Sequence, residues 1–123
     1  MPETSHTSVA FVARSTDTGE RIEATAANEV VEFYRRQTRL TATDVEWLFC
    51  EHHAVTAAPD SGGIEHVLDA LVEQFTNGVP LGIVAAAMSK QNWTVGETLD
   101  ALYELRMAGG LWEPREDHLL PLE

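Results

Sequence analysis

The stretch GLWEPREDHLLPL, residues 110–122, constrains the fold of this chain more than any other feature. Apolar residues stand on both sides of a short run that contains a proline and four charged residues. Apolar segments of strand length around a turn-forming run are typical of a β-hairpin. We therefore expect two short antiparallel strands here, with Leu111, Trp112 and Leu119 packed against the core.

A helix is expected directly before this hairpin. Thr94 and Glu97 form the S/T-x-x-E capping box that marks the start of a helix, and the glycine pair 109–110 ends it. The inward face is predicted from apolar residues at helical spacing, which are Val95, Leu99, Leu102 and Leu105.

Two further helices precede that one. Residues 64–75 carry apolar side chains at the spacing of an amphipathic helix, with Asp60 or Ser61 as its N-cap and Asn-Gly at 77–78 as its stop. Pro80 then suits the first turn of a second helix in LGIVAAAMSK, whose small residues allow close packing. Three helices followed at once by a hairpin are the order of a winged helix-turn-helix. The sequence therefore predicts an α+β fold with a winged helix-turn-helix in residues 61–123.

The first half predicts a β-hairpin followed by one or two helices. SVAFVAR and ERIEAT alternate apolar and polar residues around STDTG, which places Gly19 in the turn. NEVVEFYRRQ suits a helix with Asn28 as its cap and Glu32 and Arg36 as an i,i+4 pair, although its β-formers leave a third strand open.

The segment TATDVEWLFCEHH, residues 41–53, is expected to be a further helix. Thr43 and Glu46 match the capping box, and Val45, Leu48, Phe49 and His52 share one helical face. TAAPDSGG at 56–63 then predicts a linker between residues 1–60 and 61–123. A hairpin and helix of this size bury too little surface alone, so we expect the first part to pack on the second.

Charge is the most unusual compositional feature. The chain has 20 Asp and Glu against 8 Lys and Arg, a net charge of −12, and Lys90 is its only lysine. An acidic, lysine-poor composition resembles the proteomes of salt-accumulating halophilic archaea, although an ordinary acidic protein gains solubility in the same way. No overall positive field attracts nucleic acid, so any such contact is local.

The sequence also predicts a cytoplasmic protein. No apolar stretch approaches the roughly 18 residues of a membrane span, and the N-terminus lacks the pattern of a signal peptide. The single cysteine, Cys50, cannot form an internal disulfide, which fits a reducing compartment.

Residues 79–122 resemble a known module. The glycine, two apolar residues and Glu-Pro of GLWEP, followed by a short turn and a leucine-containing strand, are similar to the C-terminal winged-helix domain of archaeal minichromosome maintenance helicases. In that family the domain is a regulatory and interaction module, which the resemblance implies here. The phosphate-binding loop of the helicase motor is absent from this sequence, and so is the basic residue expected after Leu119, where Leu120 and Pro121 stand.

No catalytic or cofactor site is predicted. Cys50 and His53 stand at i,i+3, a spacing at which two residues of a helix could bind one metal ion together with His66 or His118. Neither a second cysteine pair nor an HExxH motif supports such a site. No phosphate-binding loop, Ser-His-Asp set or paired acid and base appears. We expect a protein that is not an enzyme and that has no metal.

The first functional hypothesis is a DNA-associated regulator of transcription or replication. Its predicted contacts to duplex DNA are the cations Arg35, Arg36, Arg39, Lys90 and Arg115. Three of these arginines lie close to Phe33 and Tyr34, and arginine beside aromatic side chains suits phosphate and base contact. A homodimer is then expected, because small DNA readers double their contacts by symmetry.

The alternative is an adaptor that uses the winged helix to bind a protein partner. The predicted outward face of the last helix carries carboxylates, which repel phosphate. The residues predicted to contact such a partner are Trp93, Glu97, Glu104 and Trp112. Neither hypothesis involves a membrane.

Overall fold

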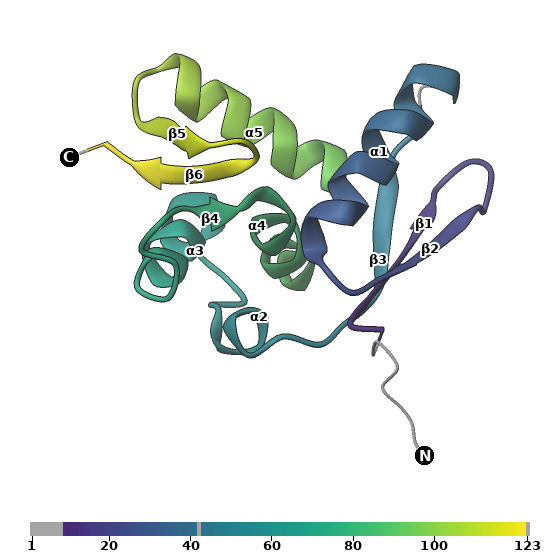
Figure 1. The fold of residues 1–123 in the computed structure, drawn as a ribbon, viewed down its shortest axis with the longest axis horizontal. Coiled ribbons are helices and arrows are strands. Elements are labelled where there is room, and N and C mark those ends of the chain that lie inside the picture. Colours follow the sequence, from purple (N-terminus) through teal and green to yellow (C-terminus); the bar gives the residue numbers. More distant parts are fainter. Residues whose placement is uncertain (1–8, 42, 123) are drawn as a thin grey trace.

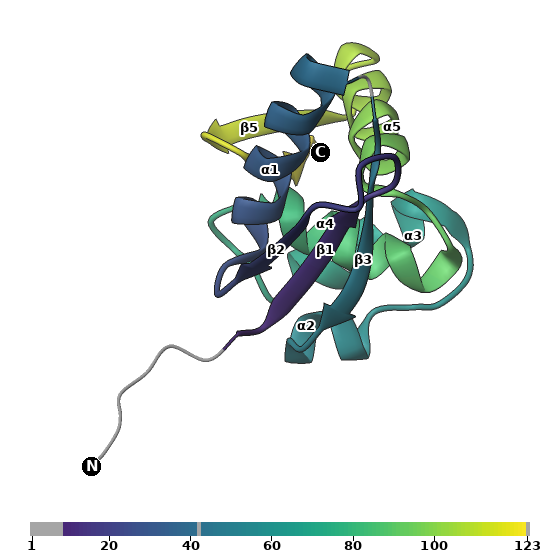
Figure 2. The same cartoon turned by 90° about the vertical axis from the view of Figure 1, so that its right-hand side faces the viewer.

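The computed structural model describes residues 9–41 and 43–122 (Figures 1 and 2). Helices pack with two three-stranded sheets, whose strand orders are β2-β1-β3 and β4-β6-β5. All of the strand pairings are antiparallel. The predicted α+β class is confirmed.

The first sheet contains the predicted hairpin and one unexpected strand. β1 (Phe11–Ser15) pairs with β2 (Arg21–Ala24), and Gly19 in the connection has a φ of +78°. β3 (Val45–Cys50) pairs with the other side of β1. Figure 2 shows the three strands side by side.

The prediction of a helix over residues 41–53 is therefore wrong, because Val45–Cys50 form a strand. Thr43 does not cap a helix there, because the residues that follow it form β3. Its hydroxyl instead lies 3.1 Å from the hydroxyl of Ser15 in β1, within hydrogen-bond distance. The open edge of β1 pairs with the segment, with Ala13 opposite Trp47 and Phe11 opposite Cys50. A short helix, α2 (His53–Ala57), begins only after the strand.

The helix predicted at NEVVEFYRRQ is confirmed as α1 (Ala27–Thr41). It starts before Asn28, so that residue is not its cap. The Asn28 amide instead accepts a hydrogen bond from the Gly82 N–H at 2.7 Å and donates to the Asp117 carbonyl at 3.2 Å. The predicted pairing of Glu32 is also corrected, because its carboxylate binds Arg35, not Arg36.

α4 (Leu81–Met88) is the central helix of the molecule (Figure 1). All of its residues from Gly82 to Met88 are buried, which is expected of a helix that is apolar on every side. It contacts α1, α2, α5 and α3 (Gly63–Val72), so the two halves of the chain share one core. The predicted linker is the short loop between α2 and α3 and does not separate two cores.

The helix predicted over 64–75 is α3, with corrected ends. Its N-cap is Gly62, which has a φ of +98°, and neither Asp60 nor Ser61 caps it. It ends at Val72, before the Asn-Gly pair at 77–78. Gly78 instead adopts a φ of +117° just before β4 (Val79–Pro80), a strand that the sequence did not predict.

The C-terminal elements follow the sequence closely. α4 continues into a 3₁₀ turn, η1 (Ser89–Gln91), and α5 (Val95–Met107) starts with the predicted Thr94 and Glu97 capping box. β5 (Leu111–Arg115) and β6 (His118–Pro121) form the predicted hairpin. Leu111 and Leu119 are buried as expected, but Trp112 is 46% exposed and does not seal the core.

Within the described residues, no helix is both long and apolar enough to cross a lipid bilayer.

His52 makes the fold sensitive to acid. Its Nδ1 accepts the Ala54 N–H at 3.0 Å and caps α2, and its ring stacks on His53 at a centroid distance of 4.6 Å. Burial and then the neighbouring His53 lower the pKa of His52 from 6.5. As the pH is lowered through about 6.5, His52 takes up a proton in the unfolded chain before it does so in the folded one. The free energy of unfolding therefore decreases as the pH is lowered.

We expect chemical denaturation from about pH 7.5 to 5.5 to show this loss in the wild type. The matched control is His52→Asn, because asparagine is a good N-cap that does not titrate. This variant should lose less stability over the same interval. An equal pH dependence in both proteins would assign the loss to other groups.

Candidate interaction surface

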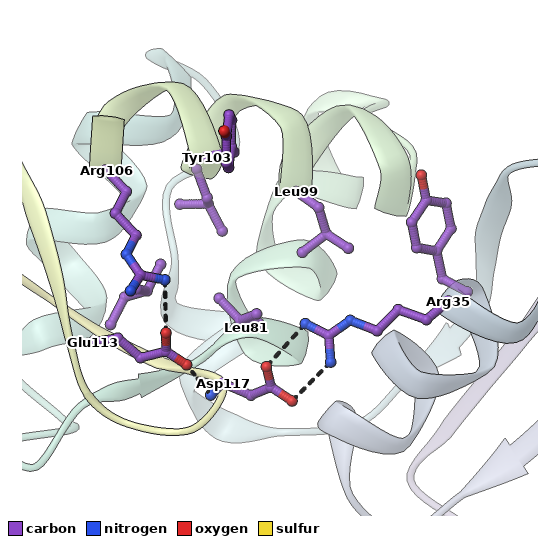
Figure 3. Close-up of a pocket in the computed structure, with 10 residues that line it drawn as sticks. Arg35, Leu81, Leu99, Tyr103, Arg106, Glu113 and Asp117 are labelled. Carbon is purple, nitrogen blue, oxygen red and sulfur yellow. Dashed lines mark hydrogen bonds and ion pairs between the residues drawn. The ribbon is translucent and has the colours of Figure 1, made fainter. Parts of the chain in front are cut away.

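An open groove of about 270 Å³ lies between α1, α5 and the β5–β6 hairpin (Figure 3). Its apolar surface comes from four leucines on α4, α5 and β6, which are Leu81, Leu99, Leu102 and Leu119. Tyr34 and Tyr103 also line it, and Tyr103 is 61% exposed. The groove therefore presents apolar and aromatic surface between the two halves of the chain.

Two ion pairs cross the groove (Figure 3). The Arg35 guanidinium on α1 donates to both carboxylate oxygens of Asp117, at 2.9 and 3.0 Å, and Glu32 binds the same guanidinium at 2.7 Å. Hydrogen bonds to Asp117 are the main cause that raises the pKa of Arg35. On the other side, Arg106 of α5 donates to Glu113 at 2.6 Å. Both groove cations are thus neutralised by carboxylates.

Asp117 joins three parts of the structure at the tip of the hairpin. Its carboxylate holds Arg35 of α1, and its carbonyl accepts the Leu81 N–H at the start of α4 at 2.9 Å. Its own N–H donates to Glu113 at 2.7 Å. The residue adopts a φ of +60°, a conformation that Asp tolerates better than most residues. The hairpin tip is therefore fixed against α1 and α4.

The outward face of α5 is acidic. Glu97, Asp100 and Glu104 are exposed on it, as the sequence predicted. Asp100 and Glu104 each directly follow a residue of α5 that lines the groove, Leu99 and Tyr103. Burial, followed by the charges of Asp44 and Asp100, raises the pKa of the groove residue Tyr34. The negative face of α5 and the apolar groove are adjacent.

The N-terminus of α5 is occupied by a carboxylate from the first half of the chain. Asp44, just before β3, accepts the Gly96 N–H at 2.8 Å and the Thr94 hydroxyl at 2.7 Å. Glu97 in turn accepts the Thr94 N–H at 2.9 Å. Free N–H groups at a helix N-terminus attract phosphate, but here the Gly96 N–H is bound by the Asp44 carboxylate and the Glu97 N–H by the Thr94 hydroxyl.

The structure separates the five predicted DNA-contacting cations into two groups. Arg35 is held in the groove, and the Lys90 ammonium donates to the carbonyls of Val55, Thr56 and Ala58, where it stabilises the C-terminus of α2. The other three side chains are exposed, two on α1 and one at the end of β5: Arg36, Arg39 and Arg115.

The predicted partner-contacting residues also differ from one another. Trp93 is half-buried against the core, and Glu97 is part of the capping box. Glu104 and Trp112 are exposed and available. Three residues of this surface were not predicted from the sequence: Tyr103 and Arg106 on the groove side of α5, and Asp44 at its N-terminus. The sequence did indicate that Tyr103 lies near the apolar face of this helix, since it stands between the predicted core residues Leu102 and Leu105.

The Cys50 and His53 metal hypothesis loses its geometric basis, because Cys50 lies on a strand and not on a shared helix. Across residues 9–41 and 43–122, no group of three or more His, Cys, Asp or Glu is arranged to hold a metal ion. Burial raises the pKa of the Cys50 thiol to about 11, so the reactive thiolate is scarce at neutral pH.

Comparison with known proteins gives two matches, one in each half of the chain. Residues 12–48 match the model of the HVO_B0008 N-terminal domain, and residues 69–119 match the model of the HVO_B0008 C-terminal domain. No curated protein and no solved structure matches. The similarity to minichromosome maintenance helicases stays a prediction, since neither match bears on it. In both halves, and in the same order, the chain is similar to the N- and C-terminal domains of HVO_B0008.

Proposed function

We propose that this protein is a non-enzymatic, cytoplasmic regulatory adaptor, built on a winged helix, that acts by binding a protein partner. The order α3-β4-α4-α5-β5-β6 and the sheet order β4-β6-β5 support the winged-helix assignment. In that architecture α5 and the β5–β6 hairpin are the elements that would contact DNA.

One observation carries the proposal: carboxylates occupy the parts of α5 that would face DNA. Asp44 fills its N-terminus, and Asp100 and Glu104 are exposed on its outward face. A reader of duplex DNA needs donors such as Arg, Lys, Asn or Gln at these positions, because the phosphates are anionic. The resemblance to a regulatory and interaction module of helicases points in the same direction.

DNA association is the second candidate, and it rests on the exposure of Arg36, Arg39 and Arg115. These three side chains could contact phosphates without α5 entering a groove. Such contacts are electrostatic, so their affinity falls steeply with salt.

Duplex binding measured by fluorescence anisotropy over a KCl series up to about 1 M separates the two candidates. We expect no saturable binding above physiological salt, in the wild type or in the variant Arg36→Ala/Arg39→Ala/Arg115→Ala. Circular dichroism at each salt concentration confirms that the protein is folded. Wild-type binding that persists at high salt and is lost in the variant would contradict the proposal and establish DNA association.

A further inference from the structure

We infer that the partner presents a basic amphipathic segment, whose apolar side chains enter the groove between α1, α5 and the hairpin and whose cations face α5. This inference rests on the proposed function, because it specifies the partner of the same surface. It follows from the size, the charge and the rigidity of the groove.

The size of the groove suits side chains. Its volume of about 270 Å³ lies below the roughly 300–1,000 Å³ of pockets that enclose a small molecule, and it is open to solvent. Leu81, Leu99 and Leu119 provide apolar contact, and the exposed Tyr103 stands beside them. Aromatic residues next to an apolar depression are typical of interface hot spots.

The charge of the surface selects a basic segment. Asp117 and Glu113 neutralise the groove arginines, and Glu32 adds a further carboxylate at Arg35. Asp100 and Glu104 then extend the negative charge along α5, at i,i+4 spacing on one side of the helix. Arg36 and Arg39 do not line the groove. An approaching segment therefore meets Asp100 and Glu104, which have no ion-pair partner among the described residues, next to apolar surface.

A second copy of the chain fits this surface poorly. Each copy carries a net charge of −12, so two copies repel one another unless salt screens the charges. The same charge attracts a cationic segment and increases its association rate.

The surface is also fixed before a partner binds. The bidentate contact between Arg35 and Asp117 holds α1 to the hairpin, and Arg106 with Glu113 holds α5 to β5. A groove held open in this way loses little conformational entropy on binding, which favours affinity for a short segment.

The test uses a fluorescein-labelled amphipathic peptide of leucine and lysine, about 18 residues or five helical turns long, with a leucine and glutamate peptide as its counterpart. We expect saturable binding of the lysine peptide alone. Asp100→Lys/Glu104→Lys should weaken this binding by about tenfold or more, because two attractive charges become repulsive. Neither carboxylate has a structural hydrogen bond to lose among the described residues.

The matched control is Glu65→Lys/Asp69→Lys, which makes the same change in net charge at two exposed i,i+4 positions of α3. It should weaken binding by less than about threefold, the share due to overall charge. Equal losses in the two variants would show unspecific attraction and overturn the inference.

The apolar contact is tested separately with Tyr103→Ala, whose side chain is exposed and not needed for the core. We expect about tenfold weaker peptide binding, and recovery in Tyr103→Phe, since the ring provides the contact. No loss in Tyr103→Ala would overturn the assignment of the groove.

The two proposals fail in different ways. Absence of lysine-peptide binding, together with absence of salt-resistant DNA binding, would overturn the basic segment and leave the adaptor function standing. Salt-resistant DNA binding would overturn the adaptor function itself. Light scattering adds a third result: a dimer that Tyr103→Ala dissociates would assign the groove to a second copy and overturn the inference.

Discussion

Gly82→Ala is expected to destabilise the protein by about 3 kcal/mol, although alanine is the better helix former by about 1 kcal/mol. Gly82 lies where α4 crosses α1, and a Cβ there would stand 2.2 Å from the carbonyl carbon and oxygen of Ala27. Backbone atoms cannot yield as a flexible side chain can, so the two helices must separate. Val30 and Val31, both fully buried on α1, lose packing as a result.

Denaturant titration at constant salt measures this loss as a shift in midpoint. Gly110→Ala is the matched control, because its Cβ would meet only the Leu105 carbonyl oxygen at 3.4 Å, and we expect a change within about 0.5 kcal/mol. A Gly82→Ala protein as stable as the control would mean that α1 moves away without cost. The contact between the two halves of the chain would then be less tight than the structure indicates.

Local sequence patterns correctly predicted the elements that are stabilised by contacts between residues close together in the chain. The capping box of Thr94 and Glu97 is formed as expected, since its donors and acceptors are three residues apart. The hairpin of β5 and β6 is likewise formed between neighbouring segments. The same kind of signal failed at Thr43 and Glu46, where the pattern is present but the chain is a strand.

Tertiary pairing explains that failure. The segment VEWLFC is rich in β-branched and aromatic residues, which suit a strand, and Val45 and Trp47 alternate with the charged Glu46. The helical spacing of Val45, Leu48 and Phe49 was coincidental. Pairing with the open edge of β1 decided for the strand against the helix. This pairing joins residues that are far apart in the sequence: Arg14 and Glu46, which are in contact, are 32 residues apart.

The candidate surface was predicted only in part for the same reason. The acidic outer face of α5 follows from helical spacing, and Glu104 was found in this way. The Arg35 side chain was expected to be free for DNA, but it binds Asp117, which is 82 residues away. No spacing rule connects such positions, so the groove and its ion pairs became visible only in the fold.

Asp44→Ala is expected to destabilise the protein by about 3 kcal/mol, because the Asp44 carboxylate accepts several hydrogen bonds at the start of α5. Its Oδ1 accepts the N–H groups of Val45 at 2.7 Å and Gly96 at 2.8 Å, and its Oδ2 accepts the Thr94 hydroxyl at 2.7 Å. Alanine leaves these three donors without their acceptor. Gly96 is buried, so water does not readily replace the lost partner.

Asp44→Asn separates the hydrogen bonds from the charge. The amide oxygen can still accept both N–H groups and the amide nitrogen can donate to Thr94, so only the attraction of a negative charge to the N-terminus of α5 is lost. We expect a cost of about 1 kcal/mol for this variant. The control is Asp60→Ala. Asp60 was predicted to cap a helix, but in the structure it is exposed and does not cap α3. We expect its removal to change the free energy of unfolding by less than about 0.5 kcal/mol.

Denaturant midpoints should therefore decrease in the order Asp60→Ala, Asp44→Asn, Asp44→Ala. The order matters because Asp44 belongs to the first half of the chain and α5 to the second. If Asp44→Ala were as mild as Asp60→Ala, α5 would not depend on this carboxylate, and its N-terminus would be open to an anion such as phosphate. A large loss would instead show that the first half of the chain closes this site and stabilises the helix on which the proposed partner docks.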